Sequence, residues 1–372
     1  MEPRAYWIAF SLVKGIGAVR LKGLLAAFGN LENAWNARAD DLREIGLSEK
    51  IIENWQRIRR GVDLDALLFN LDAKGIQAFT WEDAAYPRRL KEIDQPPPVL
   101  YVRGEILLED EWAVAIVGTR RMTVYGRQVA EELARFLVQN KISVISGLAY
   151  GVDGVAHEAA MKAGGRTLAV LGSGVDVIYP PEHRRLADQM IHQGAIVSDY
   201  PPGTQPESMN FPPRNRIISG MSLAVVVVEA SEKSGALITA SFAADQGRDV
   251  FAVPGNINAP QSKGPNILIQ NGARPLLKPE DVLDVLHLDM AQEHQAFQRE
   301  LPLEPGEAVL LQSLSAEPLH IDEIQSVSGL PIQQVSATLA LMELKGLVRQ
   351  VGAMNYVLAR EDRSVYRTED DE

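Results

Sequence analysis

NFPPRNRIISGMSLAVVVVEA, residues 210–230, places two prolines and an Arg-Asn-Arg triplet directly before the most apolar run of the chain. The run at residues 223–228 is continuous and aliphatic. A strand that is apolar on both faces is typical of the middle of a sheet that helices cover. Pro212 and Pro213 restrict the backbone before the triplet and predict the start of a short helix there. The stretch therefore predicts an α/β fold with a buried central strand.

The triplet before this strand is a candidate phosphate-binding fork. Arg214 and Arg216 carry planar guanidinium groups that match phosphate oxygens, and Asn215 lies between them. Phe211 precedes the triplet. Two interpretations of its ring stay open: it stacks on a base, or it fills the core beside Pro212.

Apolar strand segments alternate with helix-length segments between residues 113 and 253. The strand segments are 113–117, 142–146, 167–171, 195–198, 223–229 and 249–253. Helical periodicity is present at residues 124–139, 154–163, 182–192 and 235–246. Strict alternation of buried strands with helices is typical of a doubly wound parallel sheet. The central region is therefore predicted to be a Rossmann-like, doubly wound parallel sheet of the α/β class.

Residues 1–75 have a helical pattern and are predicted to form a small domain of the helix-hairpin-helix or SAM-like type. Apolar residues recur at helical spacing in residues 12–29, around a tight Gly-Ile-Gly turn at 15–17. A weaker copy of this turn begins at Ile45. Amides of such a hairpin can face a DNA phosphate. Direct DNA contact and a purely packing role both stay open.

Composition places the other domain boundaries. Residues 76–277 form the extended Rossmann-like domain, which begins with a connector that carries the triple proline 96–98. Residues 278–303 are polar and irregular and are predicted to be a linker. Residues 304–360 show three helical patterns and two short strands, the order of a winged helix, and residues 361–372 are an acidic tail. Few cations lie on the third helical pattern, so protein contact and weak duplex binding both stay open.

Composition also limits the function classes. The chain of 372 residues has no cysteine, which excludes disulfides, thiol nucleophiles and cysteine-based zinc sites. It lacks the pattern of a signal peptide and any apolar run of membrane-spanning length, so we expect a cytoplasmic protein with no membrane partner. The net charge of −12 opposes nucleic-acid binding by bulk attraction but is compatible with a local basic groove.

The loops after the predicted strands hold further candidate residues, because ligands of doubly wound sheets bind beyond the carboxyl ends of the strands. The first of these loops combines an arginine with a glycine that permits close approach of a phosphate, and Thr123 can cap the helix that follows. Small residues also follow the second and the fifth strands. The candidate DNA-binding residues of these loops are Gly118, Thr119, Arg120, Ser146, Gly147, Ser234 and Gly235.

No catalytic set accompanies these loops. We interpret Asp153 as a helix N-cap and His157 as a packed histidine. The sequence has neither the phosphate-binding loop of nucleoside triphosphatases nor the glycine fingerprint of dinucleotide-binding sheets. We therefore expect no catalytic residue, no metal site and no cofactor. Helix-end amides, arginines and an aromatic ring favour a phosphate backbone with exposed bases, which is the profile of a single-strand site.

The ordered motifs of residues 80–275 resemble the DprA (Smf) family of bacterial DNA-processing proteins. They are IVGTRRMTVYG, VISGLAYGVDGVAHEAA, TLAVLGSGVDVIYP, AIVSDYPPG, FPPRNRIISGMS, VVVVEASEKSGALITASFAADQGRDVFAVPG and GPNILIQNGA. The resemblance implies a non-enzymatic protein of natural transformation that binds and protects incoming single-stranded DNA and loads the RecA recombinase onto it. It also implies work alongside single-strand binding protein and a homodimer formed through the Rossmann-like domain.

The resemblance also implies a set of DNA-binding residues. In this family the DNA pocket is formed by the arginine loop after the first strand, the Ser-Gly loop and the FPxRNR segment. These motifs correspond here to Thr119, Arg120, Ser146, Gly147, Phe211, Arg214, Asn215 and Arg216.

Two other functions stay open. The sheet architecture also resembles that of lysine-decarboxylase-like nucleotide phosphoribohydrolases, so a nucleotide-processing hydrolase is the main alternative. The glycine-rich loop of that class, with its glutamate, is missing after Glu229. The second alternative is a transcription factor that reads duplex DNA with the winged helix while the sheet senses a nucleotide.

Overall fold

The chain forms two compact units, Met1–Val282 and Leu283–Glu372. The computed structural model describes residues 2–286, 306, 309–311, 314, 319–344, 348–351 and 354–358. Each unit has its own sheet and its own hydrophobic core. No helix among the described residues is both long enough and apolar enough to cross a membrane.

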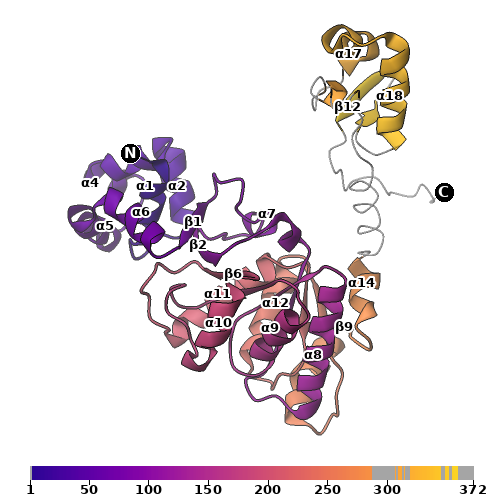
Figure 1. Ribbon diagram of the computed structural model, residues 1–372. Helices are drawn as coiled ribbons and strands as arrows, with labels where there is room; N and C mark the ends of the chain where they lie inside the picture. Colours follow the sequence, from indigo (N-terminus) through magenta and orange to yellow (C-terminus); the bar gives the residue numbers. More distant parts are fainter. Residues whose placement is uncertain are drawn as a thin grey trace, which may run out of the picture. The chain divides into compact units, whose positions relative to one another are not determined.

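A nine-stranded sheet is the centre of the first unit (Figure 1). Its strands are β1 Gln77–Thr80, β2 Val99–Gly104, β3 Ala113–Val117, β4 Ser143–Ser146, β5 Thr167–Val170, β6 Gly194–Ser198, β7 Ala224–Val227, β8 Asp249–Ala252 and β9 Arg274–Pro275. They lie in the order β1-β2-β6-β5-β4-β3-β7-β8-β9. β2 pairs antiparallel with β1 and β6, whereas all neighbours from β6 to β9 are parallel. The predicted doubly wound parallel sheet is confirmed, with β1 and β2 as an antiparallel edge.

The six predicted strands agree with β3 to β8 to within two residues at each end. They were readable because their side chains are apolar on both faces. In β5, for example, Leu168 and Val170 belong to one hydrophobic cluster, whereas Ala169 belongs to the cluster on the opposite face. β7 lies between β3 and β8 and is buried throughout, as a central strand should be.

Helices cover both faces of the sheet (Figure 1). They are α7 Arg88–Lys91, α8 Val124–Gln139, α9 Val152–Lys162, α10 Arg184–Met190, α11 Phe211–Gly220, α12 Gly235–Asp245 and α13 Lys263–Gln270, with 3₁₀ turns at Leu108–Glu111, Pro181–His183, Ser208–Asn210 and Pro260–Ser262. α7, α11 and α12 share one cluster with the sheet, and α10 packs on the opposite face. The chain changes its direction of winding between the neighbouring strands β3 and β7, which makes this the switch point of the sheet.

Six helices precede the sheet. They are α1 Pro3–Ser11, α2 Ala18–Phe28, α3 Leu31–Asn36, α4 Ala39–Glu44, α5 Glu49–Gly61 and α6 Leu64–Ala73. Gly15 turns the chain between α1 and α2 with φ 102°, and Gly46 does so between α4 and α5 with φ 86°. Two helix-turn-helix pairs therefore lie where the sequence predicted hairpins. These helices share a hydrophobic cluster with β2, β5 and β6, and their contact with DNA stays a prediction.

In the second unit, the last two of the three predicted helices and both predicted strands occur in the predicted order, whereas residues 307–308 and 312–313 of the first predicted helix lie outside the described residues. It contains β10 Leu319–His320, α17 Ile321–Ser328, α18 Ile332–Leu344, β11 Val348–Gln350 and β12 Asn355–Leu358, with the sheet order β10-β12-β11. Helix α14, Glu280–Leu286, lies in the range predicted to be an irregular linker, and its Val282 and Leu283 are buried. Residues 287–303 of that linker and the tail 361–372 lie outside the described residues.

Candidate nucleic-acid interface

A pocket lies at the carboxyl ends of β3, β4 and β5, the edge where doubly wound sheets bind their ligands. It is a shallow, partly open hollow, and its volume of about 250 Å³ includes the open solvent at its mouth. Its walls are the loops after these strands and the first turn of α11. The lining residues are Arg120, Gly147, Ala149, Tyr150, Tyr179, Pro180, Phe211 and Arg214. The structure thus brings together Arg120, Gly147, Phe211 and Arg214 from the predicted set.

Phe211 begins α11, and its half-buried ring lines the pocket. The ring centroid is 5.7 Å from that of Tyr179, and the guanidinium carbons of Arg120 and Arg214 lie 5.7 Å and 5.8 Å from it. Gly172 makes room for the ring, because a Cβ there would lie 2.9 Å from it. The ring therefore packs on the loop after β5 and has two guanidinium groups close to it.

Arg214 is buried beside the pocket. Its Nη1 donates to the carbonyl oxygen of Gly147 at 2.9 Å and to that of Val170. Burial lowers the pKa of Arg214 to about 10, and the nearby carboxyl of Asp153 opposes this shift. A Cβ on Gly147 would lie 2.7 Å from Nη1, so this loop position needs a glycine. Arg214 therefore places a fixed positive charge against the pocket and holds the loop after β4.

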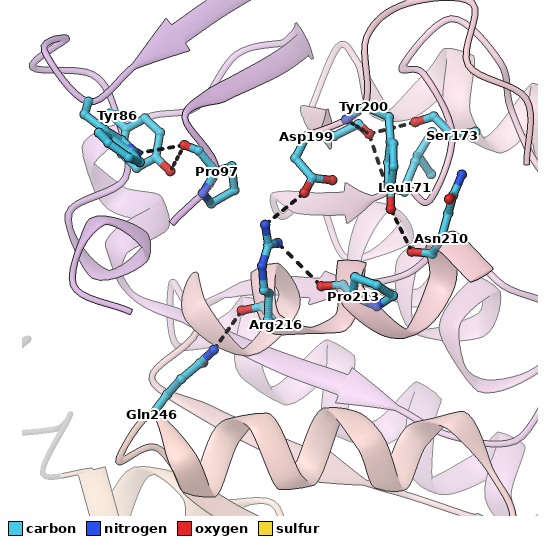
Figure 2. Close-up of polar contacts among 12 residues, drawn as sticks. Tyr86, Pro97, Leu171, Ser173, Asp199, Tyr200, Asn210, Pro213, Arg216 and Gln246 are labelled. Carbon is cyan, nitrogen blue, oxygen red and sulfur yellow. Dashed lines mark hydrogen bonds and ion pairs between the residues drawn. The ribbon is translucent and has the colours of Figure 1, made fainter. Parts of the chain in front are cut away.

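Arg216 and Asn215 are not among the residues that line the pocket. Figure 2 shows the Arg216 guanidinium directed toward Asp199, with which it pairs at 3.0 Å, and toward the Pro213 carbonyl. Asn215 Nδ2 donates to the carbonyl oxygen of Gly235. Successive residues of an α-helix point about 100° apart, so the triplet spreads over three directions of α11. The three side chains therefore have different hydrogen-bond partners, and a joint DNA contact of Arg214, Asn215 and Arg216 stays a prediction.

Asp153 shapes the loop between β4 and α9. Its Oδ2 accepts hydrogen bonds from the backbone N–H groups of Gly147 at 3.1 Å and Ala149 at 3.4 Å. Between them, Leu148 is buried with φ 57°, a strained conformation for leucine. The N-cap position of α9 is occupied by Gly151, so the interpretation of Asp153 as that cap is wrong. Burial raises the pKa of Asp153, while the charge of Arg214 opposes this shift.

The arginine loop runs from β3 to α8. Thr123 caps α8 by accepting from the Gly126 N–H at 3.1 Å, as predicted. Gly118 is required for packing, because a Cβ there would lie 2.6 Å from Val152. Thr119 is held by its backbone N–H, which donates to the Glu229 carbonyl oxygen at 2.6 Å. Neither Gly118 nor Thr119 is among the residues that line the pocket.

The other predicted residues lie outside the pocket lining. Ser146 is buried and its hydroxyl donates to the Ile116 carbonyl oxygen at 2.6 Å, a bond within the sheet. Ser234 caps α12 by accepting from the Ala236 N–H at 3.4 Å, and Gly235 is exposed. A role of these three residues in DNA binding stays a prediction.

Comparison with known proteins decides the family. The family described as DNA recombination-mediator protein A matches residues 77–287, and the DprA winged helix domain matches residues 294–354. The chain belongs to the DNA recombination-mediator protein A family. The DprA (Smf) resemblance read from the sequence and the predicted winged helix are both confirmed.

Relatives of this family match most of the chain. It is 40% identical to Protein Smf of Synechocystis over 95% of this chain and 98% of the relative. It is 41% identical to DNA processing protein DprA of Bacillus subtilis over 66% of this chain and 82% of that protein. The X-ray structure of DprA from Streptococcus pneumoniae is 35% identical, with a TM-score of 0.66 over 76% of this chain and 97% of that one. A Helicobacter pylori DprA structure that concerns single-stranded DNA binding is 32% identical, with a TM-score of 0.52 over 57% and 97% of the two chains.

Three residues of the site were not among the candidates that the sequence predicted. Tyr150 and Tyr179 line the pocket with side chains that are 39% and 37% exposed. Both could have been found in the sequence as aromatic residues within the glycine-rich loops that follow β4 and β5. Glu229 was noted only as a position before a missing motif, yet it is buried and bonds the arginine loop. Its partner Thr123 lies 106 positions earlier, so no local sequence pattern predicts the contact.

His157 is buried in α9, and its Nδ1 lies 2.7 Å from the Thr167 hydroxyl. Burial lowers its pKa to about 3, so the ring is neutral near pH 7. The interpretation as a packed histidine agrees with this environment. In the described part of this family member, no group of three or more His, Asp or Glu side chains is arranged to hold a metal ion.

Proposed function

We propose that this protein binds single-stranded DNA in the pocket beyond β3, β4 and β5. The observation that carries the proposal is the Phe211 ring, which has the guanidinium groups of Arg120 and Arg214 close to it and lies next to Tyr179. An aromatic face takes a base of any sequence, and the neighbouring cations take the phosphates on either side of it. A duplex hides its base faces, so the pocket is suited to an unpaired strand.

The charge distribution supports this proposal despite the net charge of −12. Arg120 lines the pocket, Arg121 beside it is exposed, and the buried Arg214 adds a charge that water screens weakly. A local concentration of cations is sufficient to hold a phosphate backbone where the whole surface is acidic. The name of the Helicobacter pylori DprA structure, which concerns single-stranded DNA binding, supports the same ligand.

We extend the proposal to the cellular role that the family resemblance implies. The protein would protect incoming single strands in natural transformation and competence, work alongside single-strand binding protein and load RecA in DNA recombination. It would act in the cytoplasm as a homodimer formed through the Rossmann-like domain, without a cofactor and without catalysis. The surroundings of Asp153 support a non-enzymatic role, because its carboxyl already holds two backbone amides of the loop.

The proposal is tested by replacing the aromatic ring. We expect Phe211→Ala to weaken binding of a single-stranded oligonucleotide by about 1–3 kcal/mol, since one base loses its stacking partner. Phe69→Ala is the matched control, because Phe69 is 72% exposed on α6, outside the pocket lining. Fluorescence anisotropy with a labelled oligonucleotide measures both. Equal affinity of Phe211→Ala and wild type would refute the stacking site.

A hydrolase is separated from a binding protein by a turnover assay. The proposal expects no release of base or phosphate from nucleoside monophosphates above the rate without protein. If the wild type showed turnover and Asp153→Ala abolished it, the result would favour the nucleotide-processing alternative.

A further inference from the structure

Glu229 bonds both ends of the arginine loop. It follows β7 at the switch point of the sheet and is 3% exposed. Its backbone carbonyl oxygen accepts from the Thr119 N–H at 2.6 Å. Its carboxyl accepts twice from Thr123, through Oε2 from the backbone N–H at 2.8 Å and through Oε1 from the hydroxyl at 2.5 Å. Arg120 and Arg121 are the two arginines between these anchored positions.

The first turn of α8 is shaped to receive this carboxyl. Gly126 lies in that turn, and a Cβ on it would overlap Oε2 of Glu229. The amino-terminal end of a helix has unpaired N–H groups and favours a negative group. In nucleotide-binding sheets of this topology, the phosphate of the ligand lies at the helix terminus beside the switch point. Here the chain places its own carboxyl there, so the arginines remain as the groups that bind phosphate.

We propose that Glu229 is a positioning residue for Arg120. It fixes the amino-terminal end of α8 to the end of β7, and the arginine loop from β3 to α8 then holds the Arg120 guanidinium over the Phe211 ring. The side chain acts through the loop and does not line the pocket. This inference rests on the proposed DNA-binding function of Arg120.

A first experiment needs no DNA. Glutamine at position 229 keeps the size of the side chain but replaces one acceptor oxygen by an NH₂ group, which cannot accept from Thr123. We expect Glu229→Gln to speed amide hydrogen exchange in peptides that cover residues 119–126. Glu232→Gln is the matched control, because it removes the same charge from an exposed side chain that pairs with Lys263. Exchange in Glu229→Gln equal to that of wild type would overturn the proposal.

A second experiment measures single-strand affinity in two backgrounds. We expect Glu229→Gln to weaken binding by about 3–10-fold when Arg120 is present and by less than about twofold in Arg120→Ala, because coupled residues are not additive. It should also reduce the salt slope of binding by about one unit, as loss of a single phosphate contact does. The same loss in both backgrounds would show a general structural effect and refute positioning.

The two experiments separate this inference from the proposed function. If Arg120→Ala alone binds DNA as wild type does, the proposed pocket is wrong, and the exchange experiment still decides whether Glu229 holds the loop. If Glu229→Gln does not fold, Thr123→Ala replaces it, because this change removes the hydroxyl that donates to Oε1. Unchanged single-strand affinity in Thr123→Ala would then overturn the proposal.

Discussion

Arg214 and Arg216 are two positions apart and have different surroundings. Arg214 is 5% exposed and donates to the backbone carbonyl oxygens of Gly147, which follows β4, and Val170, the last residue of β5. Arg216 makes an ion pair with the Asp199 side chain and is not among the residues that line the pocket. At the residue scale, the direction in which each side chain leaves α11 decides which arginine lines the pocket, and that residue is Arg214.

Substitution by lysine distinguishes these two arginines. Lysine keeps the charge but cannot reproduce the planar arrangement of donors, so Arg214→Lys leaves a buried carbonyl without its partner. We expect a loss of about 2–4 kcal/mol in the free energy of unfolding. For Arg216→Lys we expect about 1 kcal/mol or less, because lysine keeps the positive charge that pairs with Asp199 and loses only hydrogen-bond geometry. Urea unfolding followed by tryptophan fluorescence measures both, and equal losses would contradict this assignment.

His157 predicts a pH dependence of stability. Its pKa is about 3 in the folded protein and 6.5 without burial, so between these values the unfolded chain binds a proton that the folded chain does not. The free energy of unfolding therefore falls as the pH falls through this window, by about 1.4 kcal/mol per pH unit. Above pH 6.5 both states are neutral and the effect disappears.

The variant His157→Asn should lack this contribution. Between pH 7.5 and pH 5, we expect wild type to lose about 2 kcal/mol more stability than the variant, from the proton that the unfolded histidine takes up. Urea titrations at the two pH values measure the difference. Tryptophan fluorescence reports the first unit alone, since all five tryptophans, at positions 7, 35, 55, 81 and 112, belong to it. Identical pH dependence of the two proteins would refute the buried neutral ring.

At the scale of elements, local patterns predicted what local physics controls. Strands β3 to β8 were readable from apolar runs, and α11 from the paired prolines at its start. Helix α14 was missed because its polar surroundings hid a short apolar stripe that includes Val282. The contacts that shape the site join distant positions, such as Thr123 with Glu229 and Arg214 with Gly147. Such pairs depend on how the strands are ordered, which the sequence of one chain does not encode locally.

Two glycines of the predicted site, Gly147 and Gly235, differ in how closely other residues pack against them. A Cβ on Gly147 would lie 2.7 Å from the Arg214 guanidinium, so we expect Gly147→Ala to cost about 1–3 kcal/mol of stability. Gly235 has no heavy atom within 4 Å of a Cβ position and begins α12, so Gly235→Ala should be neutral or stabilising by up to about 1 kcal/mol. Urea unfolding compares the two variants. A neutral Gly147→Ala would contradict the close packing of the β4 loop on Arg214.

At the scale of the molecule, a chain with a net charge of −12 has a small pocket that is lined by two arginines. The sequence carries 49 acidic against 37 basic residues, which disfavours unspecific attraction to duplex DNA. The loop after β3 and the first turn of α11 nevertheless bring Arg120, Arg214 and an aromatic ring together in one pocket. Few phosphates can be neutralised there, so we expect binding that depends on exposed bases and only moderately on salt.

The most direct test of this account compares single-stranded DNA with the duplex of the same sequence at low and at physiological salt. We predict tighter binding of the single strand at both salt concentrations, measured by fluorescence anisotropy on the full chain. The logarithm of its affinity should fall with the logarithm of salt concentration with a slope of about −1 to −3, as expected for a few phosphate contacts. Equal or tighter binding of the duplex would contradict the central claim.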